Sequence, residues 1–70
     1  MKGLYMNVSI NGIDKIIEND LFVSGLITKL KLTGKFAIEI NGEIVPRSCY
    51  LETILKENDQ IEIVSAVGGG

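Results

Sequence analysis

The chain has 70 residues and a formal net charge of −2, with one cysteine and no histidine. A single cysteine cannot form an internal disulfide, and the lack of histidine excludes a zinc site of the usual Cys/His type. The acidic balance argues against nucleic-acid binding, and no apolar run approaches the roughly 20 residues that a membrane-spanning helix needs. Because 46% of the residues are hydrophobic, we expect one small domain stabilised by apolar packing.

The N-terminal sequence and the lone thiol bear on cellular location. The first ten residues, MKGLYMNVSI, lack the apolar segment of a signal peptide. Cys49 has no histidine to activate it as a nucleophile, so we expect a small half-buried residue that suits a reducing compartment. These features predict a cytoplasmic protein. One interpretation treats residues 1–5 as an extension, with Met6 as the natural start.

The first half of the chain predicts a hairpin. In YMNVSI (residues 5–10) apolar residues alternate from Met6 to Ile10, as in a half-buried strand. Asn11-Gly12 is a strong turn signal, so IDKIIE (13–18) is the return strand. A strict two-residue turn would direct Lys15 inward, and a bulged turn that directs Ile16 inward is the alternative; the sequence leaves both registers open.

A helix is predicted next, in NDLFVSGLITKLKLTG (residues 19–34). Apolar residues at i, i+3, i+4 and i+7 form one helical face: Val23, Leu26, Ile27 and Leu30. Asp20 is the expected N-cap and Thr33-Gly34 the expected C-terminal stop. Gly25 inside the helix suggests close packing on a sheet.

The second half returns to alternating patterns. FAIEI (36–40), the turn at Asn41-Gly42 and EIVP (43–46) predict a second hairpin that Pro46 ends. SCYLETIL (48–55) fits one helical turn that buries three residues: Leu51, Ile54 and Leu55. KENDQ is a polar turn, and IEIVSAV (61–67) is the last strand, with Ile61 and Ile63 directed inward.

The predicted element order is therefore β-β-α-β-β-short helix-β. This order indicates an α+β fold, with one mixed sheet of about five strands packed on one main helix. We expect a single domain over residues 1–66 and a flexible reactive tail over residues 67–70. The three final glycines have two interpretations, a frayed chain end or a functional terminus. Chain ends are often frayed, and glycine has the most conformational freedom to lose.

Several segments together resemble the ThiS family of sulfur-carrier proteins. The segment NGEIVPR at Asn41–Arg47, the strand IEIV and the final VGGG carry the resemblance, which extends over nearly all of residues 6–70. It implies a ubiquitin-like β-grasp fold. The additional MKGLY at the start and the glycine within the helix depart from the family pattern, and neither affects the tail.

The resemblance also implies a function for the tail. In this family the terminal carboxylate, here on Gly70, is adenylated with ATP by a separate ThiF-like enzyme. A sulfur-donor enzyme then converts it to a thiocarboxylate, which gives its sulfur to a ThiG-like thiazole synthase for thiamine biosynthesis. The carrier binds no cofactor or metal, is not an enzyme itself, and is expected to be a monomer when free.

The glycines suit this chemistry. Gly68 and Gly69 have no Cβ to obstruct a narrow channel, and glycine permits different tail conformations in different enzymes. Residues 67–70 span on the order of 13 Å when extended, enough to reach into another protein. Gly70 would carry the reacting group.

A docking surface is predicted beside the tail. Because Ile61 and Ile63 are directed toward the helix, alternation places Val64 and Ala66 on the uncovered face of the sheet, next to Val67. Arg47 is a further candidate for partner docking, and a solvated loop arginine is an equal alternative.

Two other functions remain open from the sequence. Sulfur carriers for molybdopterin, amino-acid synthesis or tRNA thiolation also end in Gly-Gly, and only the NGEIVPR segment favours thiamine. A β-grasp interaction module with an incidental glycine tail is the more distant alternative, and the acidic charge disfavours its RNA-contacting form.

Overall fold

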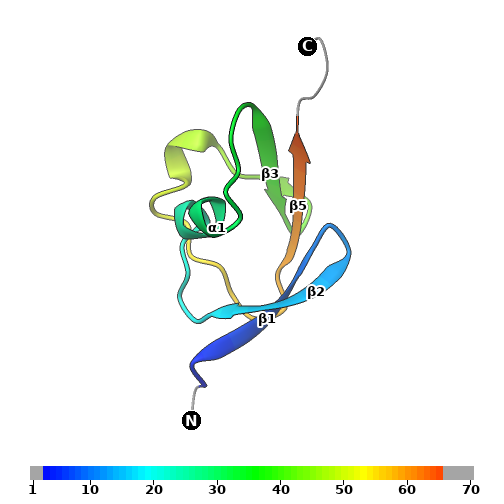
Figure 1. Ribbon diagram of the computed structural model, residues 1–70, viewed down its shortest axis with the longest axis vertical. Helices are drawn as coiled ribbons and strands as arrows, with labels where there is room; N and C mark the ends of the chain where they lie inside the picture. The colour runs from blue at the N-terminus through cyan, green and yellow to red at the C-terminus, as the bar shows by residue number, and fades with distance from the viewer. Residues whose placement is uncertain (1–2, 66–70) are drawn as a thin grey trace.

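The predicted order of elements is confirmed in the computed structural model, which describes residues 3–65. The elements are β1 (Tyr5–Ile10), β2 (Ile13–Glu18), α1 (Val23–Lys29), β3 (Phe36–Ile40), β4 (Glu43–Ile44), the 3₁₀ helix η1 (Arg47–Cys49) and β5 (Gln60–Ser65). The strands curl around α1 (Figure 1).

The five strands of the described residues form one mixed sheet in the order β2-β1-β5-β3-β4. β5 pairs in parallel with β1, and the other neighbouring strands are antiparallel. The last strand of the chain therefore lies in the middle of the sheet (Figure 1).

Two Asn-Gly turns set the register of the hairpins. Asn11 and Gly12 have φ values of 51° and 82°, and Asn41 and Gly42 have 52° and 87°. Positive φ at both central residues is the requirement of the tight turn that matches strand twist, and Asn-Gly supplies it at little cost. Both loops are two residues long, joining Ile10 to Ile13 and Ile40 to Glu43.

Of the two registers that the sequence leaves open for the first hairpin, the strict two-residue turn is the one that forms. In the strict register Met6 faces Ile17 and Val8 faces Lys15, so Ile17 is buried and Ile16 is 69% exposed. Lys15 lies on the inward face yet remains exposed. Because β2 is an edge strand, the long Lys15 side chain can extend beyond the edge of the sheet and place its charged group in water.

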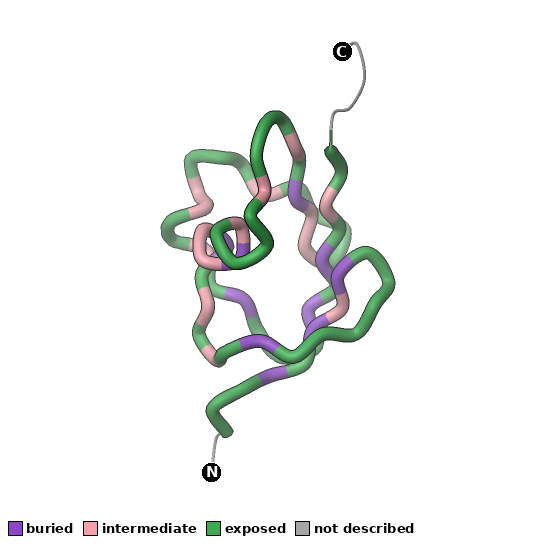
Figure 2. The backbone as a smooth tube through the Cα atoms, in the orientation of Figure 1, coloured by how far each residue is buried: buried purple, intermediate pink, exposed green. Residues whose placement is uncertain are grey.

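The core lies between the sheet and α1 (Figure 2). The predicted inward residues of β1, β3 and β5 contribute to it together with residues from β2, α1 and the segment before β5. Its buried members are Met6, Val8, Ile10, Ile17, Val23, Leu26, Ile38, Leu55 and Ile61.

The start of α1 differs from the prediction. Asp20 is not the N-cap: it has a φ of 61° in the turn after β2, and Phe22 occupies the cap position without a side-chain hydrogen bond. The first helical amides instead donate to backbone carbonyls, Val23 N to Thr53 O at 2.8 Å and Ser24 N to Tyr50 O at 3.0 Å. These carbonyls, distant in sequence, accept hydrogen bonds from N–H groups at the start of the helix that have no partner within it.

The end of α1 also comes earlier than the predicted Thr33-Gly34 stop. Lys31 has a φ of 56°, its N–H donates to Thr28 O, and the Leu32 N–H donates to Ile27 O. This pair of bonds is a Schellman motif with lysine at the left-handed position. The helix is closed before Gly34, which takes its own positive φ in the following turn.

Gly25 packs closely, but not on the sheet. A Cβ built there would lie 2.6 Å from the Leu21 Cδ1 atom. The close neighbour is therefore the side chain that precedes the helix, and the expectation of contact with the sheet is wrong.

The predicted burial of Leu51 and Ile54 is also wrong. The helical turn stops at Cys49, so the spacing expected for a longer helix does not apply. Leu51 is 81% exposed and Ile54 42% exposed, whereas Leu55 is buried. Tyr50 fills the inward position instead and stacks on Phe36, with ring centroids 6.3 Å apart.

Replacing Leu26 with alanine tests the core. Leu26 is 1% exposed, so Leu26→Ala should lower the free energy of unfolding by about 2–5 kcal/mol, a large part of the stability of a domain this small. Urea denaturation measures the change. Leu51→Ala is the matched control and should change it by less than about 0.5 kcal/mol. Equal losses in the two variants would contradict the core assignment.

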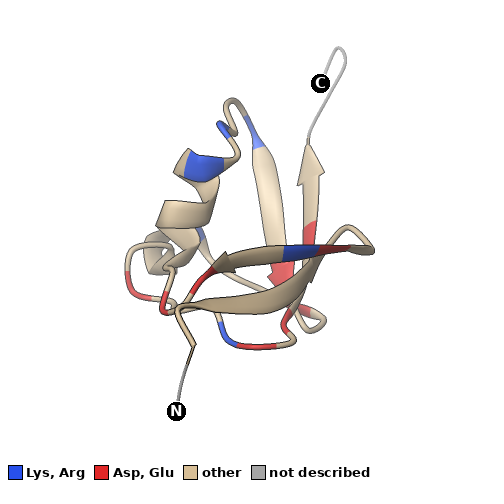
Figure 3. Cartoon of the chain, turned by 60° about the horizontal axis from the view of Figure 1, so that its bottom comes forward, with Lys and Arg blue, Asp and Glu red and all other residues tan. Residues whose placement is uncertain are grey.

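An ion pair links β2 to α1 on the surface. Lys29 Nζ lies 3.2 Å from Glu18 Oε1, and basic residues gather near the end of α1 (Figure 3). The hydrogen bond from Lys29 lowers the pKa of Glu18, assisted by a backbone hydrogen bond and by the lysine charge. A lowered pKa stabilises the fold above the unfolded-state pKa, and this contribution is lost as pH falls through the folded value.

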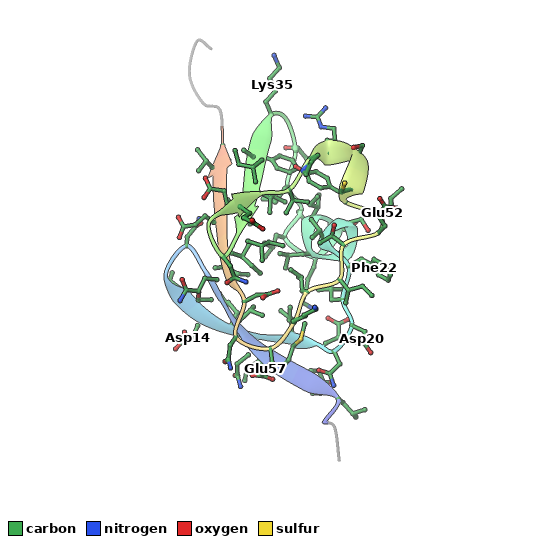
Figure 4. The ribbon with its side chains drawn as sticks, turned by 180° about the vertical axis from the view of Figure 1, so that it is seen from behind. Asp14, Asp20, Phe22, Lys35, Glu52 and Glu57 are labelled. Atoms are coloured by element: carbon green, nitrogen blue, oxygen red, sulfur yellow. The ribbon has the colours of Figure 1, made fainter. Side chains whose placement is uncertain are left out.

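Lys29→Met should therefore raise the pKa of Glu18 toward its ordinary value and weaken the acid-side dependence of stability on pH. An NMR titration of the Glu18 carboxyl carbon measures the shift. Lys35→Met is the control, because Lys35 points away from the domain at the start of β3 (Figure 4). A Glu18 pKa that is the same in wild type and Lys29→Met would show that the ion pair does not form in solution.

Candidate functional site

The candidate site is the C-terminal end of β5, where the described part of the chain leads toward the glycines. β5 is held by buried Ile61 and half-buried Ile63, which face Ile40 and Ile38 of β3. As predicted, these side chains face the core. The alternation that buries them places Val64 on the other face, opposite Ala37, where Val64 is 59% exposed.

The sheet face around Val64 combines apolar and acidic residues. Glu62 and Glu39 are directly opposite one another, and they are the nearest pair to Val64 and Ala37 on the same face of these two strands. Like charges at directly opposed positions destabilise a sheet. Ile44, which pairs with Glu39 on the other side, is 68% exposed. This combination suits a partner surface that is both apolar and basic.

The β1–β2 turn holds the end of β5 through one side chain. The Ile63 N–H donates to Asn11 Oδ1 at 2.7 Å, and Asn11 Nδ2 donates to Ile63 O at 3.2 Å. The Asn11 N–H also donates to Ile61 O at 2.8 Å. The sequence predicted Asn11 only as a turn residue, and no local signal connects it to a strand 50 residues later.

The β3–β4 turn holds the start of β5 in a similar way. The Gln60 N–H donates to Asn41 Oδ1 at 2.9 Å, and Asn41 Nδ2 donates to Asp59 Oδ1 at 3.0 Å. Asp59, which is 9% exposed, also accepts a hydrogen bond from the Lys56 N–H. Both asparagines of the Asn-Gly turns therefore fix β5, at opposite ends.

Glu57 adds a contact between the turn that precedes β5 and strand β1. Its carboxylate accepts hydrogen bonds from the Asn7 N–H and the Asn7 side chain (Figure 4). The sequence predicted a polar turn at KENDQ, and the contact shows that this turn is also bonded to β1.

The other predicted site residues lie elsewhere or outside the described part. Arg47 is exposed at the start of η1, in the segment that joins β4 to β5. Cys49 is half-buried, as predicted, and borders a shallow groove with Pro46, Ile54 and Lys56. The predicted residues Ala66, Val67, Gly68, Gly69 and Gly70 lie outside residues 3–65.

No group of three or more histidine, cysteine, aspartate or glutamate residues within residues 3–65 is arranged to hold a metal ion. No helix in the same range is long and apolar enough to cross a membrane.

Comparison with known proteins identifies the family. The profile of the ThiS family matches residues 8–70, which is most of the chain. The chain belongs to the ThiS family. The resemblance inferred from NGEIVPR and VGGG is thereby confirmed.

Solved structures confirm the ThiS fold. A crystal structure of the thiamine biosynthesis protein ThiS from Geobacter metallireducens is 30% identical, with a TM-score of 0.81 over 93% of this chain and all of that one. A solution structure of a thiamine biosynthesis protein from the same organism has a TM-score of 0.78, with 88% of its chain covered. The expected α+β, ubiquitin-like β-grasp fold is correct.

Sequence relatives include longer proteins. The chain is 36% identical over 66 residues to a thiazole synthase of Paramagnetospirillum magneticum. The match covers 93% of this chain and only 20% of that protein, so the ThiS chain spans about a fifth of the length of such relatives. It is also 30% identical to the uncharacterized protein ycf40 of Porphyra purpurea, over 93% of both chains.

Proposed function

We propose that this ThiS family protein carries sulfur for the synthesis of the thiazole ring of thiamine. It acts as a covalent co-substrate and not as an enzyme. The Gly70 carboxylate attacks ATP on a ThiF-like adenylating enzyme and releases pyrophosphate. A sulfur donor then displaces AMP to leave a thiocarboxylate, which gives its sulfur to a ThiG-like thiazole synthase.

The observation that carries the proposal is the position of β5. This strand is fixed in the centre of the sheet, and it points directly into the sequence Ala66-Val67-Gly68-Gly69-Gly70. A strand that is paired on both sides is thus followed in the sequence, after Ala66 and Val67, by three residues without side chains, which suits delivery of a chain end to another protein. The matches to the ThiS family and to thiazole synthases favour thiamine over the other sulfur-transfer pathways.

The tail chemistry needs nothing further from the carrier. An α-carboxyl group is ionised at neutral pH, because its ordinary pKa is about 3.5, and it can act as a nucleophile toward ATP. Gly68 and Gly69 let the backbone approach the nucleotide closely. ATP and the catalytic groups then belong to the partner enzymes, and the carrier is a monomer between encounters.

The surface around Val64 is the proposed docking face. An enzyme that holds the tail must contact the sheet beside it, and an exposed apolar side chain surrounded by charge is typical of an interface anchor. Glu62 and Glu39 add acidic charge that a basic partner surface would neutralise. Ala66 and Val67, which follow Val64 and Ser65 in the sequence, and Arg47 are further candidates for docking.

Changing the chain end tests the function. Deleting Gly70, or adding a few residues after it, touches no core residue and should leave the circular dichroism spectrum unchanged. Adenylation should be lost, because the reactive carboxylate would be absent or displaced. ATP–pyrophosphate exchange with the adenylating enzyme measures this. Full exchange activity with an extended chain would rule out the carrier function.

Val64→Asp tests the docking face. Val64 is exposed, so the substitution should have little effect on stability, but it should weaken binding to the adenylating enzyme by about 1–2 kcal/mol or more. Titration calorimetry measures the affinity. Ile16→Asp is the control, because Ile16 is an exposed apolar residue on the edge strand β2, away from β5. Equal affinity of wild type and Val64→Asp would place the docking face elsewhere.

A further inference from the structure

The parallel pairing of β1 with β5 stops where β1 turns back. The Ser9 N–H donates to Asp59 O at 3.0 Å, and the Asn11 N–H donates to Ile61 O at 2.8 Å. Each bond of this ladder lies two residues further along both strands, so the next one would join the N–H of residue 13 to the Ile63 carbonyl. The chain reverses at Asn11-Gly12, so the backbone of β1 cannot reach that position.

The Asn11 side chain takes the place of the missing strand residue. Its amide accepts from the Ile63 N–H and donates to the Ile63 carbonyl. A residue directly opposite in a hydrogen-bonded antiparallel pair exchanges the same two bonds. A side-chain amide can do this because it has an acceptor and a donor side by side.

Ile63 is therefore the last residue of β5 that is held on both flanks. On one flank it pairs with β3, opposite Ile38, and on the other flank it bonds to Asn11. Val64 and Ser65 follow with pairing to Ala37 and Phe36 of β3 alone. Beyond Ile63, the described part of β5 is therefore held on one flank only.

We propose that Asn11 is a positioning residue for the reactive chain end. By fixing Ile63, its amide sets the direction in which β5 leads toward Gly70 and increases the fraction of carriers that are aligned for entry into the adenylating enzyme. This inference rests on the proposed carrier function. If only a fraction of the carriers is aligned, the apparent affinity falls by that fraction.

Asn41 provides a matched control. It occupies the equivalent position of the other Asn-Gly turn, with nearly the same φ, and its side chain also makes two hydrogen bonds next to β5. Those bonds hold Gln60 and Asp59, at the opposite end of the strand. Glycine accepts positive φ, so Asn11→Gly and Asn41→Gly remove the side-chain bonds without backbone strain.

Two measurements on these variants test the proposal. In the free protein, NMR hydrogen exchange at the Ile63 amide should become roughly three- to tenfold faster in Asn11→Gly and should change little in Asn41→Gly. In adenylation, Asn11→Gly should raise the KM for the carrier by a similar factor with kcat unchanged, because the aligned carrier reacts as before. Asn41→Gly should keep the wild-type KM, even where its thermal stability falls equally.

The outcomes separate the possibilities. Equal KM values for the two glycine variants would reduce Asn11 to a structural turn residue and overturn the proposal, as would unchanged exchange at Ile63. Absence of adenylation in the wild type would instead refute the carrier function, and the exchange data would still show whether Asn11 holds Ile63. Should Asn11→Gly fail to fold, Asn11→Asp keeps the turn conformation and an acceptor for the Ile63 N–H but loses the donor to Ile63 O. The KM for the carrier should then rise, and an unchanged KM would overturn the proposal.

Discussion

The structure depends on hydrogen bonding to both flanks of β5. This strand joins the β1–β2 hairpin to the β3–β4 hairpin, and without it the two hairpins would share no backbone pairing. Ile61, the second residue of β5, is fully buried, next to β1 on one side and β3 on the other. The two Asn-Gly turns then add side-chain bonds at its two ends, so features that look local in the sequence all act on one strand.

Much of the fold could be predicted from the sequence because its strands follow simple local rules. Alternation identified the inward residues of β1, β3 and β5, and Asn-Gly located both turns. The alternative register, which would direct Ile16 inward, arose because the strict two-residue turn places a lysine on the inward face. Burying a lysine would destabilise the fold, but β2 is at the edge of the sheet, so Lys15 stays exposed to water.

The ends of the helical segments could not be predicted in the same way. Asp20 is a good capping residue by type, but carbonyls about 30 residues later already occupy the amides of α1. Leu51 and Ile54 have helical spacing, but the segment forms only one 3₁₀ turn. The candidate site divides similarly: the exposure of Val64 follows from alternation, whereas the bonds of Asn11 to Ile63 depend on tertiary structure.

The capping of α1 by the segment before β5 has a consequence for cooperativity. A helix of seven residues is too short to persist in water alone, and its first amides are satisfied only while Tyr50 and Thr53 stay in place. That segment is in turn held by the Leu55 N–H, which donates to Leu21 O at 2.8 Å. Helix and segment must therefore open together, and neither can form a separately unfolding unit. A protein that binds this domain would therefore meet the helix and this segment as one rigid unit.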